Sequence, residues 1–252
     1  MWQVPDEPSI YPYTCQKTVP ARSLIVFAPH PDDEVFGCGG LLAACLQAGI
    51  RVQVVLVTSG DQGGDAPARE RESTAAAFAL ARGNAPAVPQ FWRLPDRGVL
   101  PDAALVQRMR AAIVDSGADW VLCTSPYEIH PDHRAVSLAA TQAFADTLGA
   151  QPDARLAWYE VGHPLFANLL IDITDVVDRK RAAIHCFPSQ LAVQDYGDQL
   201  LALNRFRSYT LGPGVSHAEA YQVLDSTQLQ AGVEAALHAQ TDRLAHRLGL
   251  RA

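Results

Sequence analysis

The chain has 252 residues, of which 48% are apolar and 19% are charged. Such a composition is typical of a globular protein with a sizeable core and argues against an intrinsically disordered chain. The formal net charge of −7, with no run of Lys or Arg longer than three residues, argues against a nucleic-acid-binding surface. The apolar runs are far shorter than a membrane-spanning helix requires, so we expect no membrane span.

The first residues, Met1–Tyr13, have neither the basic nor the apolar region of a signal peptide. The five cysteines are widely spaced, odd in number and include no Cys-x-x-Cys pair. Reduced thiols of an intracellular protein explain this pattern better than a disulfide framework or a thiolate zinc site. We therefore expect a cytoplasmic protein with a Pro-rich, irregular arm over residues 1–22 and a single domain over residues 23–252.

Beyond the arm, short apolar and β-branched runs alternate with helical patterns. Strands are predicted at Ser23–Pro29, Arg51–Ser59, Pro89–Leu94, Asp119–Ser125, Arg155–Val161 and Asn168–Ile173. Helices are predicted at Val35–Gln47, Arg69–Ala81, Asp102–Ser116, His133–Leu148, Asp175–Cys186, Val193–Arg207 and Thr227–Arg247. This alternation indicates βαβ units in an α/β domain with a mostly parallel sheet. The usual order of such sheets, 3-2-1-4-5 counted from the first predicted strand, makes the first and fourth strands neighbours.

Two polar clusters follow these neighbouring strands. Pro29–Glu34 (PHPDDE) comes directly after the first strand, and His130–His133 (HPDH) comes shortly after the fourth. The winding of the chain reverses between these strands, and ligands bind in the crevice that opens at such a switch point. We therefore expect the two clusters to face each other across the crevice, although they are far apart in the sequence.

The residue types in the clusters suit a catalytic metal site. Imidazole and carboxylate groups bind zinc, and a catalytic zinc has three protein ligands and one open position. His30, Asp33 and His133 could supply these three ligands. Asp32 and His130 would then lie beside the metal, available for proton transfer and charge stabilisation.

Several candidates admit two interpretations. A single His-Pro-Asp is commonly only a turn or a cap, but two at one switch point favour a site. Asp132 could cap the helix that begins near His133, and we retain it as a catalytic candidate. Arg69 could bind a substrate hydroxyl or phosphate, or it could simply pair with Glu72 on its helix. Asp96, after the third strand, is equally open to a substrate-binding or a turn role.

Three further features are weaker. The glycine-rich run Gly37–Gly40 lacks the G-x-G-x-x-G pattern of a phosphate loop, and we expect it to allow close packing of the helix. Ser189 has no nucleophile-elbow context, which disfavours a serine hydrolase. His217 lies beside a Gly-Pro-Gly turn and is a minor candidate for the site.

The two clusters carry a family resemblance. Together, PHPDDE and HPDH resemble the motifs of the PIG-L/LmbE-like metal-dependent de-N-acetylases, and the resemblance extends from about Arg22 to Leu224. Weaker matches occur in the order in which the family shows them: Arg69 with Glu72, Leu94-Pro95-Asp96, Tyr159-Glu160, Asp172-Ile173-Thr174, Ser189-Gln190 and Ala218-Glu219-Ala220.

The resemblance implies a Rossmann-like, three-layer α/β/α fold. It implies a Zn²⁺ ion, or another divalent metal such as Fe²⁺, bound by His30, Asp33 and His133. It also implies that Asp32 is the general base and that His130 stabilises the oxyanion or protonates the leaving amine.

These observations predict a hydrolase that removes an N-acyl group, most simply acetyl, from a small molecule that contains an amino sugar. Arg69 and Asp96 are the substrate-binding candidates. Some members of sugar-thiol pathways have a tyrosine two residues before the first histidine of HPDH, where this chain has Glu128, with Tyr127 one residue earlier. A non-sugar amide or carbamate as substrate, and a non-catalytic Rossmann-type binding module, are the alternatives. An oligomer is compatible with the sequence.

Overall fold

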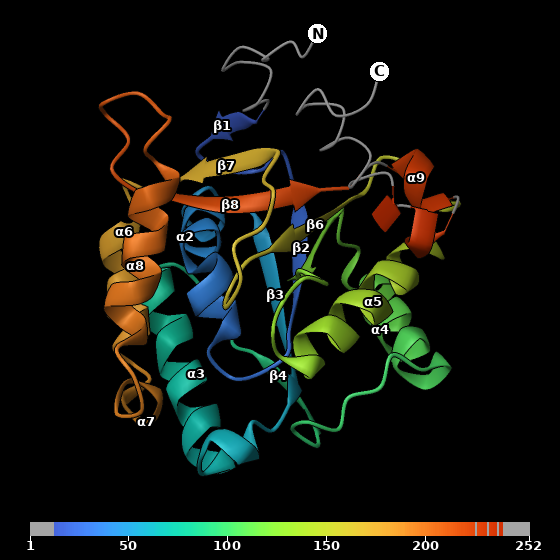
Figure 1. Ribbon diagram of the computed structural model, residues 1–252, viewed down its shortest axis with the longest axis horizontal. Helices are drawn as coiled ribbons and strands as arrows, with labels where there is room; N and C mark the ends of the chain where they lie inside the picture. Colours follow the sequence, from blue (N-terminus) through green and yellow to red (C-terminus); the bar gives the residue numbers. More distant parts are fainter. Residues whose placement is uncertain (1–12, 225, 231, 236, 239–252) are drawn as a thin grey trace, which may run out of the picture.

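The computed structural model describes residues 13–224, 226–230, 232–235 and 237–238, and they fold around one eight-stranded sheet (Figure 1). The strands are β1 (Thr14–Gln16), β2 (Ser23–Ala28), β3 (Arg51–Thr58), β4 (Gln90–Leu94), β5 (Trp120–Thr124), β6 (Arg155–Tyr159), β7 (Leu169–Asp172) and β8 (Ala218–Val223). The helices are α2 (Asp33–Gln47), α3 (Ala66–Ala81), α4 (Ala103–Ser116), α5 (Pro131–Ala145), α6 (Val177–Ile184), α7 (Pro188–Leu191), α8 (Tyr196–Arg207) and α9 (Ser226–Gln230). Over these described ranges, no helix has the length and apolar character needed to cross a membrane.

The strand order is β1-β7-β8-β6-β5-β2-β3-β4. The five strands from β6 to β4 pair in parallel throughout. Counted from β2, their order is the predicted 3-2-1-4-5, which is therefore confirmed. Strand β8 is antiparallel to both of its neighbours, β6 and β7, so the sheet is mostly parallel, as predicted.

Helices cover both faces of the sheet, which confirms the three-layer α/β/α fold (Figure 1). Helices α2, α3, α6 and α8 lie on one side, and α4 and α5 lie on the other. Successive residues of β2 point to opposite faces: Leu24 and Val26 belong to one buried core, while Ile25 and Phe27 belong to the other. Because β2 is buried on both faces, neither face is polar, and its sequence is therefore an almost continuous apolar run.

Strand β8 was not predicted from the sequence, because its residues, AEAYQV, contain no apolar run. Its polar residue Glu219 is nevertheless fully buried. A lysine from α6, Lys180, pairs with it inside the protein. Tertiary contacts therefore make this segment a central strand despite its polar sequence.

The N-terminal arm also differs from the expectation of irregular structure. Thr14–Gln16 forms the edge strand β1, which pairs in parallel with β7. Residues 1–12 lie outside the described part of the chain. The edge of the sheet supplies backbone partners to a segment whose composition alone does not predict a strand.

Three predicted helices have different limits. Helix α3 begins at Ala66 rather than Arg69, because the Asp65 side chain accepts a hydrogen bond from the Ala68 N–H and caps the helix. The helix predicted over Val193–Arg207 is α8 alone, and a separate short helix, α7, precedes it. Of the helix predicted over Thr227–Arg247, the described part contains α9 and is interrupted near Gly232, where φ is 109°; residues 239–252 lie outside the description.

Candidate active site

The PHPDDE loop connects the carboxyl end of β2 to the start of α2. Asp32 has a φ of 134°, a left-handed conformation that residues with a side chain rarely adopt. Its N–H donates to Glu34 Oε2 at 3.0 Å, which holds the turn in place. Backbone strain of this kind, of the order of 1–3 kcal/mol, occurs mostly at functional sites. The two adjacent aspartates consequently contact different groups: Asp33 contacts His30, and Asp32 contacts Arg69.

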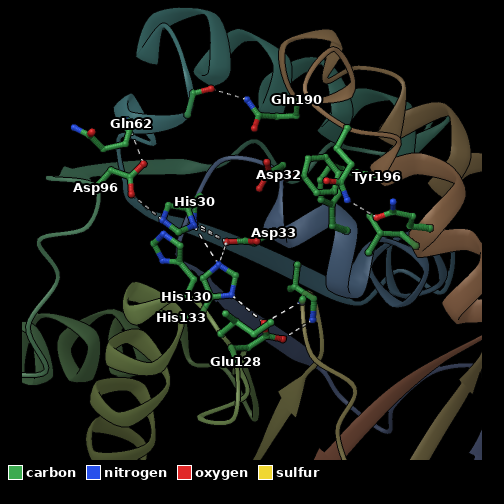
Figure 2. Close-up of a pocket in the computed structure, with 18 of the residues that line it drawn as sticks. His30, Asp32, Asp33, Gln62, Asp96, Glu128, His130, His133, Gln190 and Tyr196 are labelled. Carbon is green, nitrogen blue, oxygen red and sulfur yellow. Dashed lines mark hydrogen bonds and ion pairs between the residues drawn. The ribbon is translucent and has the colours of Figure 1, made fainter.

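Three donor atoms from the two motifs form a nearly equilateral triangle. His30 Nδ1 lies 3.2 Å from Asp33 Oδ2 and 3.2 Å from His133 Nε2, and His133 Nε2 lies 3.1 Å from Asp33 Oδ2. All three side chains are buried. Figure 2 shows them gathered at the base of a pocket. The expected meeting of the two clusters at the β2–β5 switch point is thus present in the fold.

The spacing of this triangle fits a tetrahedral metal. Zinc bonds of about 2.0–2.1 Å at tetrahedral angles separate the ligand atoms by about 3.3 Å. The imidazole of His130 is close as well, since one ring nitrogen of each of His30, His130 and His133 lies within 4.8 Å of the others. The imidazole–carboxylate donor set of His30, Asp33 and His133 suits zinc.

The charges of the triangle also fit a cation. Burial disfavours charge on each group, but Asp132 and Asp33 hold the pKa of His30 well above its usual value. In His133, the charge of Asp33 outweighs burial and raises the pKa to about 9. The two imidazoles in turn lower the pKa of the buried Asp33. The cluster therefore binds protons strongly, and a metal ion that took their place would release them.

His130 is the N-cap of α5, because its Nδ1 accepts a hydrogen bond from the Asp132 N–H at 3.2 Å. The proposed capping role of Asp132 is therefore wrong; this residue lies in the first turn of the helix instead. Since Nδ1 is an acceptor, a neutral His130 carries its proton on Nε2. Burial and the neighbouring His30 and His133 lower the pKa of His130, which favours this neutral form.

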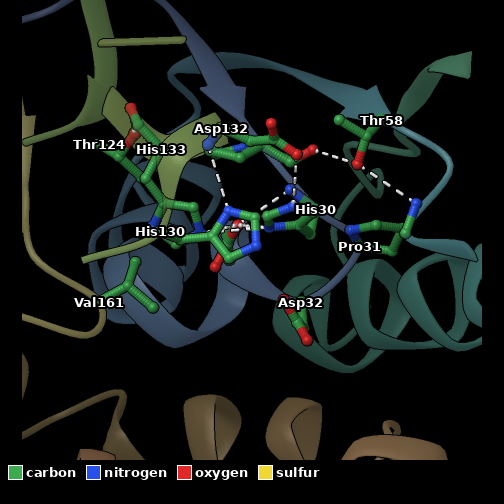
Figure 3. Close-up of polar contacts among 12 residues, drawn as sticks. His30, Pro31, Asp32, Thr58, Thr124, His130, Asp132, His133 and Val161 are labelled. Carbon is green, nitrogen blue, oxygen red and sulfur yellow. Dashed lines mark hydrogen bonds and ion pairs between the residues drawn. The ribbon is translucent and has the colours of Figure 1, made fainter. Parts of the chain in front are cut away.

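The carboxylate of Asp132 lies behind His30. It accepts the backbone N–H of Arg97 at 2.6 Å and that of Val99 at 3.3 Å, and Oδ2 lies 3.3 Å from His30 Nε2. Figure 3 shows Asp132 and Asp32 on opposite sides of His30. Asp132 is thus placed to orient the imidazole of His30 through the nitrogen that does not face the triangle.

Arg69 is buried and contacts the carboxylate of Asp32. Its guanidinium donates to Asp32 Oδ2 at 2.9 Å and to the carbonyls of Gly60 and Pro31, both at 2.7 Å. Three of the five N–H groups of an arginine are therefore bound within the protein. Burial and the charge of Asp33 raise the pKa of Asp32 to about 7, and Arg69 opposes this rise.

Asp96 reaches the site from the loop after β4. Its Oδ1 lies 3.2 Å from His30 Nε2, and its Oδ2 accepts the Gln62 N–H at 3.2 Å. Despite partial burial, His30 lowers the pKa of Asp96 to about 2, so the carboxylate is ionised. Asp96 and Arg69 therefore both lie at the site, on the same pocket as the triangle.

Glu128 is a site residue whose role the sequence analysis left open. It is buried and accepts the backbone N–H groups of Val161 at 2.7 Å and Gly162 at 2.9 Å, while Oε2 lies 3.5 Å from His133 Nδ1. Its position, between the end of a predicted strand and the HPDH motif, is the sequence feature that could have indicated a role in the site. Tyr127, by contrast, packs edge-on against Trp158.

The pocket above the triangle has a volume of about 620 Å³, within the range of small-molecule sites. Its opposite wall comes from α7 and α8 and includes Gln190, Tyr196 and Leu200 (Figure 2). Gln190 belongs to the Ser189-Gln190 family match, but no sequence motif marked Tyr196 or Leu200 as part of the site. His217 is not among the described residues that line the pocket, and Ser189 hydrogen bonds to Glu72, which therefore does not pair with Arg69.

The glycine run packs closely, as expected. A Cβ atom at Gly37 would lie 2.3 Å from the ring of Tyr159, and one at Gly40 would lie 2.5 Å from Ile173 Cγ2. Both distances are shorter than van der Waals contact, so these two positions of α2 require glycine.

Comparison with known proteins gives three consistent findings. The family described as PIG-L, GlcNAc-PI de-N-acetylase, matches residues 25–144. Diacetylchitobiose deacetylase of Thermococcus kodakarensis is 29% identical over 67% of this chain and 70% of its own length. A probable N-acetyl-α-D-glucosaminyl L-malate deacetylase of Bacillus anthracis is 24% identical over 69% of this chain and 83% of its own length.

A solved structure agrees in fold. N,N'-diacetylchitobiose deacetylase from Pyrococcus horikoshii superposes with a TM-score of 0.72 at 22% identity and covers 82% of this chain and 85% of its own. The structure shares the α/β fold of that deacetylase, and the matched family and relatives are deacetylases, which places this chain in the deacetylase class of enzymes. More particularly, the chain is similar to the PIG-L/LmbE-like de-N-acetylases, whose family model matches residues 25–144.

Proposed function

We propose that this protein is a zinc-dependent deacetylase that removes the acetyl group from an N-acetylated amino sugar or glycoconjugate. The observation that carries the proposal is that the site contains both a set of metal ligands and a separate carboxylate that can act as a base. His30, Asp33 and His133 form a triangle of metal-ligand size, while the carboxylate of Asp32 stands beside it on the same pocket and is bound by Arg69. A site built only to bind a ligand has no use for a base that is not a ligand.

His30, Asp33 and His133 would hold the metal, which when bound supplies Lewis-acid chemistry by polarising the acyl carbonyl and acidifying a water molecule. Asp32 accepts the proton from the attacking water, a contribution of about 10²–10⁴-fold in rate for a well-placed base. Arg69 keeps the Asp32 carboxylate in place through the 2.9 Å hydrogen bond.

His130 supplies the second function. Because its Nδ1 accepts the Asp132 N–H, its Nε2–H can donate to the oxygen that becomes negative as water adds to the carbonyl. Asp32 then passes the proton that it took from the water to the departing amine, so that acetate and the free amine leave. In this proposal Asp132 orients the metal ligand His30 from behind.

The pocket suits a sugar substrate. Ionised Asp96 can accept hydroxyl hydrogen bonds, and the glutamine side chains of Gln62 and Gln190 line the pocket as uncharged polar groups. The volume of about 620 Å³ has room for more than the acetamido group alone. The relatives named above act on N-acetylated sugars, which supports this substrate class.

Two substitutions at adjacent residues test the proposal. Asp32→Asn keeps size and hydrogen bonding but cannot accept a proton, so it should retain zinc while acetate release falls by at least about 10²-fold. Asp33→Asn should instead lose zinc affinity. Metal content by mass spectrometry and acetate release from N-acetylglucosamine and diacetylchitobiose, measured on both variants, decide the roles.

The opposite result would reverse the assignment: an Asp32 variant that loses zinc beside an active, zinc-replete Asp33 variant. If the wild-type protein binds zinc but releases no acetate from either compound, the substrate class is wrong. If neither substitution changes the rate on a substrate that is turned over, the proposed base is wrong.

A further inference from the structure

Helix α2, which carries Asp33 in its first turn, is not continuous. Cys38 has φ −134° and ψ 16°, which are not helical values, so the helix is broken one turn after the PHPDDE loop. In a regular helix the Gly40 N–H would pair with the Phe36 carbonyl, four residues earlier. Here each of these groups has a side-chain partner from another element: Gly40 N–H donates to Glu219 Oε1 at 2.7 Å, and the Phe36 carbonyl accepts from Lys180 Nζ at 2.9 Å.

The two side chains pair with each other between these groups. Lys180 Nζ lies 2.6 Å from Glu219 Oε1, and both side chains are completely buried. The second oxygen, Glu219 Oε2, accepts the Leu41 N–H and the Tyr221 hydroxyl, both at 2.8 Å. The ion pair from α6 and β8 is thus inserted at the break of α2, and side-chain insertion into the hydrogen-bond ladder is a recognised cause of helix kinks. Figure 1 shows α6 beside α2, with β8 crossing next to them.

The Glu219 carboxylate packs tightly against the backbone of α2 at Gly40. A Cβ atom at Gly40 would lie 2.9 Å from Glu219 Oε1, so only glycine allows the carboxylate to approach the backbone this closely. The part of α2 before the break contains both Asp33 and Phe36, which lines the substrate pocket. The part after the break packs into the core through residues such as Leu41 and Leu42.

A buried ion pair is a weak source of stability, because the loss of hydration on burial offsets most of the attraction. Apolar residues of similar size would often stabilise a fold as well. A role in specifying one geometry explains the Lys180–Glu219 pair better than stability alone, since its contacts lie on both sides of the break.

We infer that Lys180 and Glu219 are positioning residues for the metal site: they fix the break in α2 and so set the direction of its first turn, which presents Asp33 to His30 and His133. The inference rests on the proposed function, because it assigns the pair to the geometry of the zinc-binding triangle. Neither residue contacts the pocket, so both act only through α2.

The test separates geometry from stability. The double variant Lys180→Met/Glu219→Leu replaces the pair with apolar residues of similar volume, whereas Lys180→Met alone leaves a buried carboxylate without its cation. The matched control is Glu70→Leu/Arg93→Met, which removes an ion pair between α3 and β4 whose side chains are 22% and 66% exposed. For each protein we would measure the melting temperature, the zinc affinity by chelator competition, and kcat and KM for deacetylation.

The single variant should melt about 6–20 °C lower, as expected for a buried unpaired charge in a protein of this size. The double variant should recover most of this loss yet bind zinc at least about tenfold more weakly, the scale seen for outer-shell changes. The control should match the wild type in zinc affinity. A folded double variant with wild-type zinc affinity and kcat would overturn the inference.

Two further results keep the test decisive. If the double variant does not fold, Glu219→Gln serves in its place, since it keeps the size and one acceptor oxygen; it should also bind zinc at least about tenfold more weakly, and wild-type affinity in this variant would overturn the inference. The wild type in the same assay reports on the proposed function: absence of zinc binding there refutes the zinc site itself, whereas normal binding with unchanged variants refutes only the positioning role.

Discussion

The contact between Glu128 and His133 leads to a quantitative prediction about zinc affinity. His133 Nδ1 is buried and has no hydrogen-bond partner in the described structure, and Glu128 Oε2 is 3.5 Å away. When His133 binds a metal through Nε2, Nδ1 carries a proton and needs an acceptor. Glu128 is the acceptor in place, and its carboxylate is anchored by the N–H groups of Val161, Gly162 and His163 at 2.7, 2.9 and 3.4 Å.

The substitution Glu128→Gln tests this contact. A glutamine presents one oxygen and one NH₂ group, but each oxygen of Glu128 faces a donor: Oε1 accepts the Val161 N–H, and Oε2 accepts the Gly162 N–H and faces Nδ1 of His133. One contact must therefore be lost. Loss of such a partner weakens metal binding by about 10–100-fold, equivalent to about 1.4–2.7 kcal/mol.

Chelator competition with purified, metal-free protein measures this change, and thermal unfolding of the same samples shows whether the fold is intact. Glu234→Gln is the matched control, because the Glu234 side chain is 92% exposed and its partner among the described residues is the exposed His238. A zinc affinity of Glu128→Gln within about twofold of the wild type, in a folded protein, would refute the reasoning.

Three other substitutions have clear expectations. His133→Ala should purify with little bound metal under conditions that load the wild type with about one equivalent, as measured by elemental analysis. Arg69→Met should retain zinc but lower kcat by about tenfold or more, because Asp32 loses the guanidinium that holds it; unchanged steady-state kinetics would contradict this. Gly37→Ala should lower the free energy of unfolding by about 1–3 kcal/mol in denaturant titration, because its Cβ would lie 2.3 Å from the Tyr159 ring.

The parts of the fold that the sequence predicted are those with a local signal. Apolar runs and helical patterns predicted the strands β2 to β7 and the helices α2 to α6 and α8, and the parallel order of β2 to β6 follows from general rules of α/β sheets. Strand β8 could not be found in this way. Its buried Glu219 is compatible with a strand only because Lys180, from a different element, pairs with it.

The site, too, has a part that was predictable from the sequence and a part that was not. The meeting of His30, Asp33 and His133 was predictable, because the PHPDDE and HPDH motifs both follow strands that are neighbours at a switch point. The part of the wall formed by Tyr196 and Leu200 was not predictable, since α8 carries no motif and reaches the pocket through packing alone. Arg69 was identified as a candidate, but its contact with Asp32 depends on how α3 docks against the loop.

The two adjacent aspartates show how tertiary contacts assign different chemistry to identical residues. Burial raises the pKa of both carboxyl groups, so burial does not distinguish them. Asp33 faces the imidazoles of His30 and His133, which lower its pKa and keep it an anion suited to a metal. Asp32 is turned away by its φ of 134°, faces the negative charge of Asp33 and has a pKa raised to about 7, despite Arg69. A carboxyl group with a pKa of about 7 can both take up and release a proton near neutral pH, which is what a general base must do.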